Sequence, residues 1–430
     1  MWGVQKPSQT EYRLIRYHLQ TEHEGASLLC NTVTGELVEL SDADKEILAS
    51  LPAPYTKQMQ QLVEHHFLVP TDYDECTTVR QLRKILRMMD RKKPMSTCTI
   101  LPTTACNARC FYCFEAGFRH TTMSRETADR VIAFIERHAD RKNLYIHWFG
   151  GEPTLGAKII DYISEALRRD GFTYYAHMTS NGYLFDADMA DRARELWKLE
   201  QIQITLDGTE EVYNRVKAYP GVSGSPYRRV LDNIGLLLER GVAVSVRMNL
   251  DRHNEDDLAK LIGELEGRFG TDKNLSIYVV PLFEDCGFKP VAHTTEDKQH
   301  LAHRQLALYE LIAGKAMLKK TRLPHLKLNC CMADTDSSAI ITPDGKLAKC
   351  EHRLEESVGD LESDYTEPEL IASWKETTEI PECSDCPLFP GCVRLKKCTS
   401  AGKCILEHRN NETEKLRFSM RLLHLSVNNE

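Results

Sequence analysis

Between residues 96 and 282, short runs rich in β-branched and aromatic residues alternate with longer segments of helical periodicity. Short apolar runs bounded by turn residues are typical of strands, and apolar residues spaced three and four apart are typical of helices. Strict alternation of the two predicts an α/β fold with a parallel sheet covered by helices, and six such units suit a partial (β/α)6 barrel. The predicted strands are residues 96–104, 143–149, 173–179, 201–207, 243–250 and 275–282, and the predicted helices are residues 124–139, 156–169, 186–197, 227–240, 255–269 and 298–319.

The segments on both sides of this alternating core show a different pattern of hydrophobic and polar residues. The N-terminal flank mixes short strand-like runs with two amphipathic stretches, and Ser41 begins a helix-capping sequence. This predicts a small α+β module, winged-helix-like, joined to the core by a helical linker. The C-terminal flank loses the alternation, gathers cysteines and ends in a charged helical tail. The predicted domains are the N-terminal module (1–76), the linker (77–95), the core (96–322), the cysteine-rich domain (323–410) and the tail (411–430).

Composition narrows the class of protein. The chain has 430 residues, of which 42% are hydrophobic and 27% charged, which is typical of a soluble globular protein. The net charge of −8 argues against a nucleic-acid partner, and no apolar run approaches the roughly 20 residues that a membrane span needs. Fifteen cysteines, without an apolar signal segment at the N-terminus, favour a cytoplasmic protein whose thiols bind metal rather than form disulfides.

Three of these cysteines follow the first predicted strand of the core, with C-x3-C-x2-C spacing: Cys106, Cys110 and Cys113. Three such thiolates can ligate three irons of a four-iron cluster and leave the fourth iron open for catalysis. The alternatives are buried apolar cysteines or a zinc site. Burial does not explain the spacing, and zinc needs a fourth ligand, whereas the next cysteine in the chain is Cys286.

Unusual polar residues and glycines follow the next four predicted strands, at the edge where the active face of such a barrel lies. Each alone is compatible with a turn or a helix cap. Arg247 is less easily explained, since it lies in a strand of valines and a buried guanidinium needs an anionic partner. The residues are Gly150-Gly151-Glu152-Pro153 after the second strand, Ser180-Asn181 after the third, Asp207 at the end of the fourth, and Arg247 and Asn249 in the fifth.

The cysteine loop and these four motifs, in this order, resemble the radical S-adenosylmethionine superfamily over about residues 99–250. The resemblance implies that the open iron chelates S-adenosylmethionine and cleaves it to a 5′-deoxyadenosyl radical. It implies that Cys106, Cys110 and Cys113 hold this [4Fe–4S] cluster and that Tyr112 packs by the adenine. The resemblance implies that Gly150, Gly151, Glu152 and Pro153 contact the methionine amino group, Ser180 and Asn181 the ribose, and Arg247 the carboxylate. Asp207 and Asn249 are implied as further cofactor-binding residues.

The later cysteines resemble the SPASM extension of the same superfamily, which carries auxiliary [4Fe–4S] clusters. One departure is that Lys396 stands where that pattern has a cysteine, and Cys398 takes the role. The ligand set Cys331, Cys350 and Cys398 is one ligand short of four. Cys330 or Cys286 could complete it, or one iron could stay open. A zinc knuckle is the alternative. One or two clusters are implied, one held by Cys331, Cys350 and Cys398, the other by Cys383, Cys386, Cys392 and Cys404.

SPASM enzymes mostly act on peptides, and the N-terminal module resembles, in its order of elements, the peptide-recognition element of enzymes that mature ribosomally made peptides. This implies a precursor peptide whose leader adds as a strand to a sheet edge; a scaffold domain is the alternative. The leading hypothesis is cross-linking of that peptide through a thioether or a carbon–carbon bond, with an external electron donor such as flavodoxin or ferredoxin. The alternatives are formylglycine formation and, in a different class, a non-catalytic iron–sulfur carrier.

No general acid or base stands out in the sequence. Glu115, His147 and Tyr213 are candidates, each of which also fits a structural role. Cys30, Cys76 and Cys98 have no partners at metal-binding spacing and are expected to be ordinary buried residues.

Overall fold

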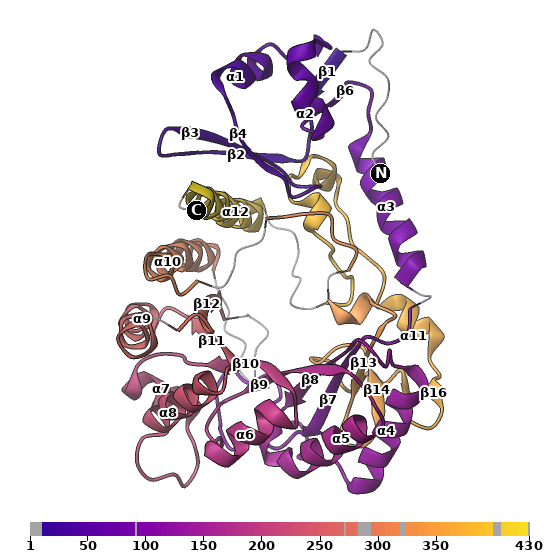
Figure 1. Ribbon diagram of the computed structural model, residues 1–430, viewed down its shortest axis with the longest axis vertical. Helices are drawn as coiled ribbons and strands as arrows, with labels where there is room; N and C mark the ends of the chain where they lie inside the picture. The colour runs from indigo at the N-terminus through magenta and orange to yellow at the C-terminus, as the bar shows by residue number, and fades with distance from the viewer. Residues whose placement is uncertain are drawn as a thin grey trace.

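The computed structural model describes residues 11–90, 93–270, 272–282, 294–318, 323–329, 331–398 and 406–428. The N-terminal module lies at one end of the long axis and the strand–helix core at the other (Figure 1). Much of the cysteine-rich region lies between them, beside helix α3 (Glu75–Asp90).

The core confirms the predicted partial (β/α)6 fold. Six parallel strands lie side by side in chain order, with a helix in every connection between them. The predicted boundaries hold to within a few residues, and one short helix, α7 (Glu210–Lys217), was not predicted. The strands are β7 (Thr97–Thr103), β8 (Leu144–Gly150), β9 (Tyr174–Ser180), β10 (Leu199–Thr205), β11 (Ala243–Leu250) and β12 (Leu275–Pro281), and the helices are α4 (Arg125–His138), α5 (Ala157–Arg169), α6 (Ala187–Glu195), α8 (Pro226–Glu239), α9 (Glu255–Phe269) and α10 (Thr295–Gly314).

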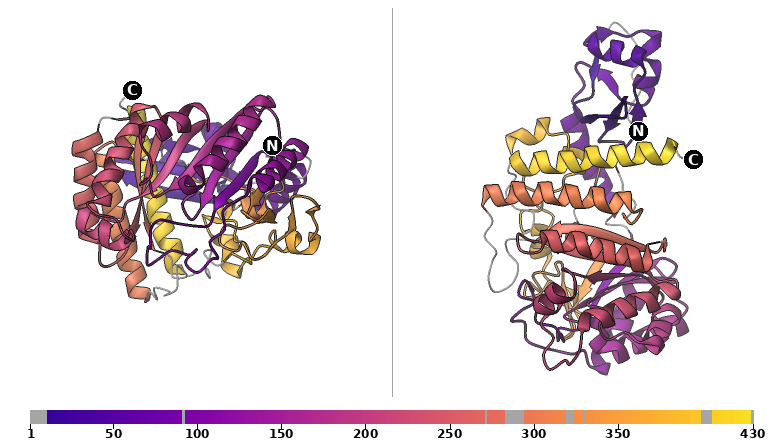
Figure 2. Two further views of the ribbon diagram at one scale, coloured as in Figure 1. Left: turned by 90° about the horizontal axis from the view of Figure 1, so that it is seen from below. Right: turned by 90° about the vertical axis from the view of Figure 1, so that its left-hand side faces the viewer.

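The two faces of this sheet differ in what they carry. In β8, Ile146 and Trp148 are fully buried on one face, while His147 and Phe149 on the other face are half-buried. Figure 2 (left) shows the helices packed along one side of the curved sheet. The apolar face therefore forms the core against the helices, and the face with histidines and aromatic rings is left for the site.

The cysteine-rich region is joined to the core through the sheet itself. Strand β13 (Ser338–Ile341) pairs in parallel with β7, and β14 (Lys346–Ala348), β15 (Gly359–Asp360) and β16 (Asp364–Tyr365) continue the sheet in antiparallel fashion. These strands were not predicted, because all four residues of β13 are buried and show no alternation. Apart from helix α11 (Pro368–Ser373), the other described residues between 331 and 398 form 3₁₀ turns and loops.

The N-terminal module contains two three-stranded antiparallel sheets, in the orders β5-β1-β6 and β2-β3-β4. The predicted cap is confirmed, since the Ser41 side chain accepts a hydrogen bond from the Asp44 backbone N–H at the start of α1. Strands β1 and β2 were not predicted because their residues are largely polar. The elements are β1 (Glu11–Leu14), β2 (His18–His23), β3 (Ala26–Asn31), β4 (Leu37–Glu39), α1 (Asp42–Ala49), β5 (Ala53–Pro54), α2 (Gln60–Glu64) and β6 (Leu68–Pro70).

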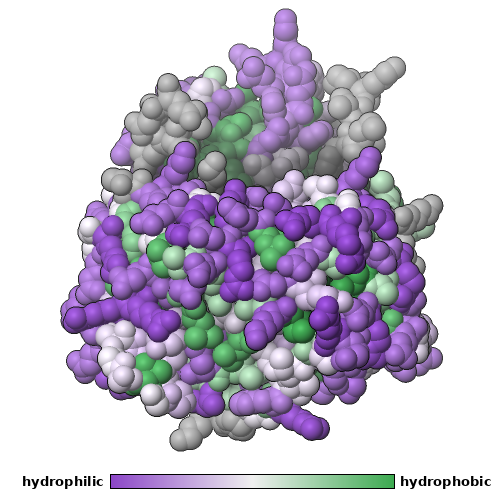
Figure 3. Space-filling model, turned by 60° about the horizontal axis from the view of Figure 1, so that its bottom comes forward, coloured by the Kyte–Doolittle hydropathy of each residue, from purple (hydrophilic) through white to green (hydrophobic). Residues whose placement is uncertain are grey.

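Helix α12 (Leu406–Asn428), close to the predicted tail helix, lies between the module and α10 (Figure 2, right). Met420 of α12 packs with Leu19, Leu28 and Cys30 of the β2-β3-β4 sheet. None of the helices in the described ranges is long and apolar enough to span a membrane. Figure 3 shows a face on which hydrophilic side chains predominate and apolar ones form small, separate patches.

Candidate functional site

The three-cysteine loop begins just after β7. Cys106, Cys110 and Cys113 are half-buried. Burial raises the pKa of Cys106 to about 12 and that of Cys113 to about 11, and negative charge on the neighbouring thiols adds to both shifts. The three sulfur atoms are therefore close enough to influence one another, as the ligands of one cluster must be.

Two buried polar atoms near these thiols have no hydrogen-bond partner among the described residues. They are Asn107 Nδ2 and Glu115 Oε1. An unsatisfied buried polar group costs about 1–3 kcal/mol, so such groups commonly face a ligand or ordered water. Together with three thiols, these atoms fit a [4Fe–4S] cluster that carries a polar nucleotide.

The geometry of the cysteines also bears on the zinc alternatives. Zinc requires four donors around a single ion. Within the described ranges, no three His, Cys, Asp or Glu side chains converge closely enough to hold one metal ion. In an iron–sulfur cluster each thiolate binds a different iron, so its ligands need not converge on one point.

The paired glycines after β8 pack directly against the chain leading to the first cysteine. Gly150 has φ +111°, and a Cβ there would lie 2.3 Å from the Thr103 carbonyl oxygen. A Cβ at Gly151 would lie 2.4 Å from the Ala105 carbonyl oxygen. Glycine is therefore required for close backbone packing at both positions. Pro153 follows at the start of a 3₁₀ turn.

Glu152 connects this turn with the end of β9. Its carboxylate is fully buried and accepts bonds from the Thr154 N–H (3.1 Å), the Ser180 hydroxyl (2.8 Å) and the Asn181 N–H (2.8 Å). Burial raises the pKa of Glu152, and these donors oppose the rise. The Asn181 side-chain amide donates in turn to Asn107 Oδ1 in the cysteine loop (2.6 Å). The structure thus brings three of the predicted motifs into one network.

Tyr112 is held by a buried ion pair. Its hydroxyl donates to Asp207 (2.5 Å) and accepts from the Lys217 ammonium (2.9 Å), which lies 3.2 Å from the Asp207 carboxylate. Burial alone would lower the pKa of Lys217, but the Asp207 carboxylate and neighbouring groups raise it well above its usual value. Lys217 was missed from sequence, because a lysine ending a short helix is typical of any solvated helix terminus.

The same network continues to β11. Asn249 Nδ2 donates to the other oxygen of Asp207 (3.0 Å), and Arg247 Nε donates to Asn249 Oδ1 (2.9 Å). Asp207 is fully buried, so it acts as the connecting carboxylate between the cysteine loop and β11. The structure thereby brings together Tyr112, Asp207, Asn249 and Arg247.

The candidate acids and bases lie in different surroundings. His147 is 3.3 Å from Glu351 and 3.0 Å from the Thr179 hydroxyl, on the open face of the sheet. Burial raises the pKa of Glu115 to about 7, with a further contribution from Glu351. Tyr213 is fully buried in the core, where its hydroxyl meets that of Tyr219 at 3.0 Å, so its role is structural.

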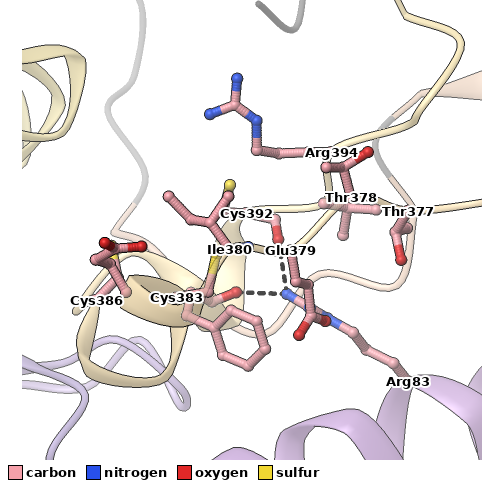
Figure 4. Close-up of a pocket in the computed structure, with 12 residues that line it drawn as sticks. Arg83, Thr377, Thr378, Glu379, Ile380, Cys383, Cys386, Cys392 and Arg394 are labelled. Atoms are coloured by element: carbon pink, nitrogen blue, oxygen red, sulfur yellow. Dashed lines mark hydrogen bonds between the residues drawn. The ribbon is translucent and has the colours of Figure 1, made fainter. Parts of the chain in front are cut away.

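The later cysteines form two groups. Burial raises the pKa of Cys350 to about 11, and the charges of Cys331 and Cys398 add to the shift, which places these three near one another. Cys383, Cys386 and Cys392 line one pocket together with Arg83 from α3 (Figure 4). Cys286, Cys330 and Cys404 lie outside the described residues.

Comparison with known proteins supports this picture. Residues 100–265 match the family model of the radical SAM superfamily. The Fe-coproporphyrin III synthase of Methanosarcina barkeri is 24% identical over 182 residues, which are 42% of this chain and 43% of that protein. The cysteine-type anaerobic sulfatase-maturating enzyme of Clostridium novyi is 26% identical over 179 residues, 38% of this chain and 46% of that enzyme. The chain therefore spans less than half the length of either relative.

Solved structures share the fold. Native anSMEcpe with bound AdoMet and Kp18Cys peptide has a TM-score of 0.59 at 16% identity, covering 77% of this chain and 99% of that one. Streptococcus suis SuiB bound to its precursor peptide SuiA has a TM-score of 0.55 at 14% identity, covering 89% of this chain and 94% of that one.

Proposed function

Because this chain is an enzyme with a radical S-adenosylmethionine domain, we propose that it modifies a ribosomally made precursor peptide, removing hydrogen to form a thioether or carbon–carbon cross-link. The observation that carries the proposal is the cysteine loop at the sheet edge where the cofactor motifs meet, in which the buried Asn107 Nδ2 has no hydrogen-bond partner among the described residues.

In this proposal Cys106, Cys110 and Cys113 hold the [4Fe–4S] cluster, and the network around Glu152 shapes the S-adenosylmethionine site. When bound, the cluster and S-adenosylmethionine would supply radical chemistry that removes one hydrogen atom from the peptide, and the oxidised cluster would take up the electron released when the second hydrogen leaves as a proton. Glu152 Oε2 accepts a bond from the Asn181 N–H, and a carboxylate oxygen can accept two. Oε2 therefore retains capacity for an ammonium group.

The chain's own residues keep the loop in place. The Lys217 carbonyl accepts a bond from the Arg109 backbone N–H (2.8 Å), and the Lys217 side chain binds Tyr112 and Asp207. The middle of the loop, at Arg109, and its C-terminal part, at Tyr112, are therefore anchored to Lys217 at the end of α7. We propose that this anchorage positions the cofactor, together with Gly150, Gly151, Pro153, Ser180, Arg247 and Asn249.

The peptide would meet the open face of the sheet beside the loop. His147 and His177 stack at 4.8 Å between ring centroids on β8 and β9. Phe114, one residue after the last loop cysteine, stacks on His352 at 4.0 Å. We propose that these aromatic rings contact the side chain that is modified. The auxiliary clusters would lie on the other side of that side chain, one held by Cys331, Cys350 and Cys398 and the other by Cys383, Cys386, Cys392 and Cys404.

The leader peptide would add to strand β4. Helix α12 covers β2, where Arg417 Nε donates to the Gln20 carbonyl (3.1 Å) and Arg421 to the Thr21 hydroxyl (3.3 Å). Within the described residues, β4 pairs only with β3. The backbone on its other side is available for an added strand. The SuiB structures cover more of this chain than the anSMEcpe structures do. This wider coverage supports a leader-binding module.

The test is to incubate the reduced, anaerobic enzyme with S-adenosylmethionine and the peptide encoded beside it. We expect 5′-deoxyadenosine and a peptide that has lost two hydrogens per link, which tandem mass spectrometry localises. A peptide without its leader should react much more slowly. Formation of 5′-deoxyadenosine with an unchanged peptide would contradict cross-linking, and no 5′-deoxyadenosine at all would favour a non-catalytic carrier.

Formylglycine formation is the second candidate, favoured by the sulfatase-maturating relative and by the anSMEcpe structures. The same mass measurement separates the two activities. A cysteine converted to formylglycine loses its sulfur, whereas a thioether retains it.

The proposed electron donor is an external flavodoxin or ferredoxin, and the proposed location is the cytoplasm. A donor must approach a metal centre closely. Arg353, Lys396 and Lys397 line a surface pocket with Cys398, which offers a docking position for such a carrier. Chemical cross-linking of flavodoxin to these lysines tests this assignment.

A further inference from the structure

The turn that carries Cys383, Cys386 and Cys392 has little regular structure, and its carbonyl oxygens are bound by residues from distant parts of the chain. From the N-terminal module, the Tyr17 hydroxyl donates to the Ser384 carbonyl (3.1 Å). The Thr32 hydroxyl donates to the Pro387 carbonyl (2.6 Å). The turn therefore takes its shape from outside the cysteine-rich region.

Arg83 makes the densest set of these contacts. Its Nη2 donates to the carbonyl oxygens of Phe389 (2.5 Å), Pro390 (3.0 Å) and Cys392 (3.0 Å), and its guanidinium lies 4.8 Å from the centre of the Phe389 ring. Figure 4 shows the side chain reaching from α3 into the pocket that the three cysteines line. A planar guanidinium with several donors suits this convergence of acceptors, and a lysine there would retain the positive charge with fewer of these bonds.

Arg83 and Arg80 differ in the charge of the groups to which they donate hydrogen bonds. Arg80, one turn earlier, pairs with the Glu379 carboxylate at 2.6 Å. Arg83 donates to carbonyl oxygens, which carry no net charge, although the Glu379 carboxylate that pairs with Arg80 lines the same pocket. A positive charge beside a group that gains an electron stabilises the reduced form, and nearby charge and hydrogen bonds are known determinants of iron–sulfur potentials.

We propose that Arg83 is a positioning residue for the auxiliary iron–sulfur cluster of Cys383, Cys386 and Cys392, whose turn it holds and whose reduction potential it raises. This inference rests on the auxiliary cluster of the proposed function. Residues of the N-terminal module and of α3 would then surround the cluster, so that the part of the chain proposed to bind the leader contacts the turn that would hold a redox centre.

The experiment is a redox titration followed by electron paramagnetic resonance. The full chain is used with Cys106, Cys110 and Cys113 changed to alanine, so that the remaining signals come from the cysteine-rich region. Arg83→Gln removes the charge, and Arg83→Lys retains it. Lys84→Gln is the matched control, because it removes a positive charge from the next residue of the same helix, where the side chain is exposed.

Arg83→Gln should shift the one-electron reduction equilibrium of one auxiliary signal at least tenfold toward the oxidised form. This corresponds to a midpoint potential lower by 59 mV or more. Arg83→Lys and Lys84→Gln should change the equilibrium less than threefold, and the other auxiliary signal should stay unchanged in all variants. Selective loss of iron from Arg83→Gln, with iron retained in Arg83→Lys and Lys84→Gln, would also support the assignment, because it shows that the turn needs the cation.

Equal midpoints in Arg83→Gln and the unsubstituted chain, with both clusters loaded, would overturn the role of Arg83 while leaving the proposed function intact. If the unsubstituted chain shows no auxiliary cluster by iron analysis or spectroscopy, the auxiliary sites and this inference fall together. Cleavage of S-adenosylmethionine by the chain with its loop cysteines intact would still be measurable, so the two failures are distinguishable.

Discussion

The two cysteine regions are supported in different ways. The Cys106–Cys113 loop follows a strand of a regular sheet and is anchored by neighbouring strand ends and by α7, all within the core. The Cys383–Cys392 turn is bound instead by Tyr17, Thr32 and Arg83. The first site should therefore depend on the core alone, and the second on the integrity of the N-terminal module and α3.

The difference also concerns the kind of interaction. The core site uses buried charges, since both side chains of the Asp207–Lys217 pair are almost completely excluded from solvent. The turn is bound mainly through neutral carbonyl oxygens, by the buried Tyr17 and Thr32 and the half-buried Arg83. Buried ion pairs tolerate the loss of one partner poorly, whereas single hydrogen bonds to carbonyls contribute about 1 kcal/mol each. The core site should be rigid and sensitive to substitution, and the turn more adaptable.

The largest expected effect separates the chemistry of the two regions. Changing Cys106, Cys110 and Cys113 to alanine should reduce 5′-deoxyadenosine formation to background, because no thiolates remain to hold the cluster. Changing Cys383, Cys386 and Cys392 to alanine should abolish peptide cross-linking while 5′-deoxyadenosine formation remains detectable. Chromatography of the nucleoside and mass spectrometry of the peptide measure the two outcomes, with Cys30→Ala as control. If both triple variants behaved alike, the two regions would not have separate roles.

A large effect on stability is expected at the core anchor. Lys217→Met leaves the Asp207 carboxylate buried without its cation and should lower the free energy of unfolding by about 3–5 kcal/mol. Chemical denaturation measures this loss, and Arg215→Met on the same helix, whose side chain is mostly exposed, should cost far less. A small effect of Lys217→Met would mean that Tyr112 is held by other contacts.

A smaller effect is expected at Glu152. In Glu152→Gln, the amide group would place its own donors against those of Thr154, Ser180 or Asn181. Loss of bonds to a charged acceptor should cost about 2 kcal/mol and weaken S-adenosylmethionine binding on the order of tenfold. Calorimetric binding and thermal unfolding test both parts. Unchanged affinity with reduced stability would assign Glu152 a purely structural role.

The smallest effect should appear in the N-terminal module as pH falls. Burial lowers the pKa of His18 and of His66 in the folded chain. Below about pH 6.5, the ordinary histidine pKa, the unfolded chain binds protons that the folded module binds less readily, so stability is lost as pH decreases. Hydrogen exchange corrected for intrinsic rates should show less protection in residues 11–70 at pH about 5.5 than at about 7.5, with no matching change in β7–β12. The double variant His18→Gln, His66→Gln should lose this dependence.

The regular core was predictable because its strands and helices carry unambiguous periodicity, and the motifs at strand ends follow from that placement. Lys217 was not, since its partner Asp207 is ten residues away and only the fold of α7 brings the two together. Strand β13 escaped prediction because a four-residue strand buried on both faces has no alternating pattern. Contacts such as Arg83 to Cys392 join residues far apart in sequence, which no local pattern reveals.

Strand β13 also has a consequence for the distance between the two kinds of metal region. Ser338–Ile341 pairs with residues 97–100 of β7, so Cys331 and Cys350, which flank β13 and β14, belong to the same hydrogen-bonded framework as the loop after β7. Any electron passing between them would travel across a nearly constant separation, whatever the N-terminal module does. A shortened protein ending before residue 338 would leave the backbone of β7 unpaired on one side and prone to self-association.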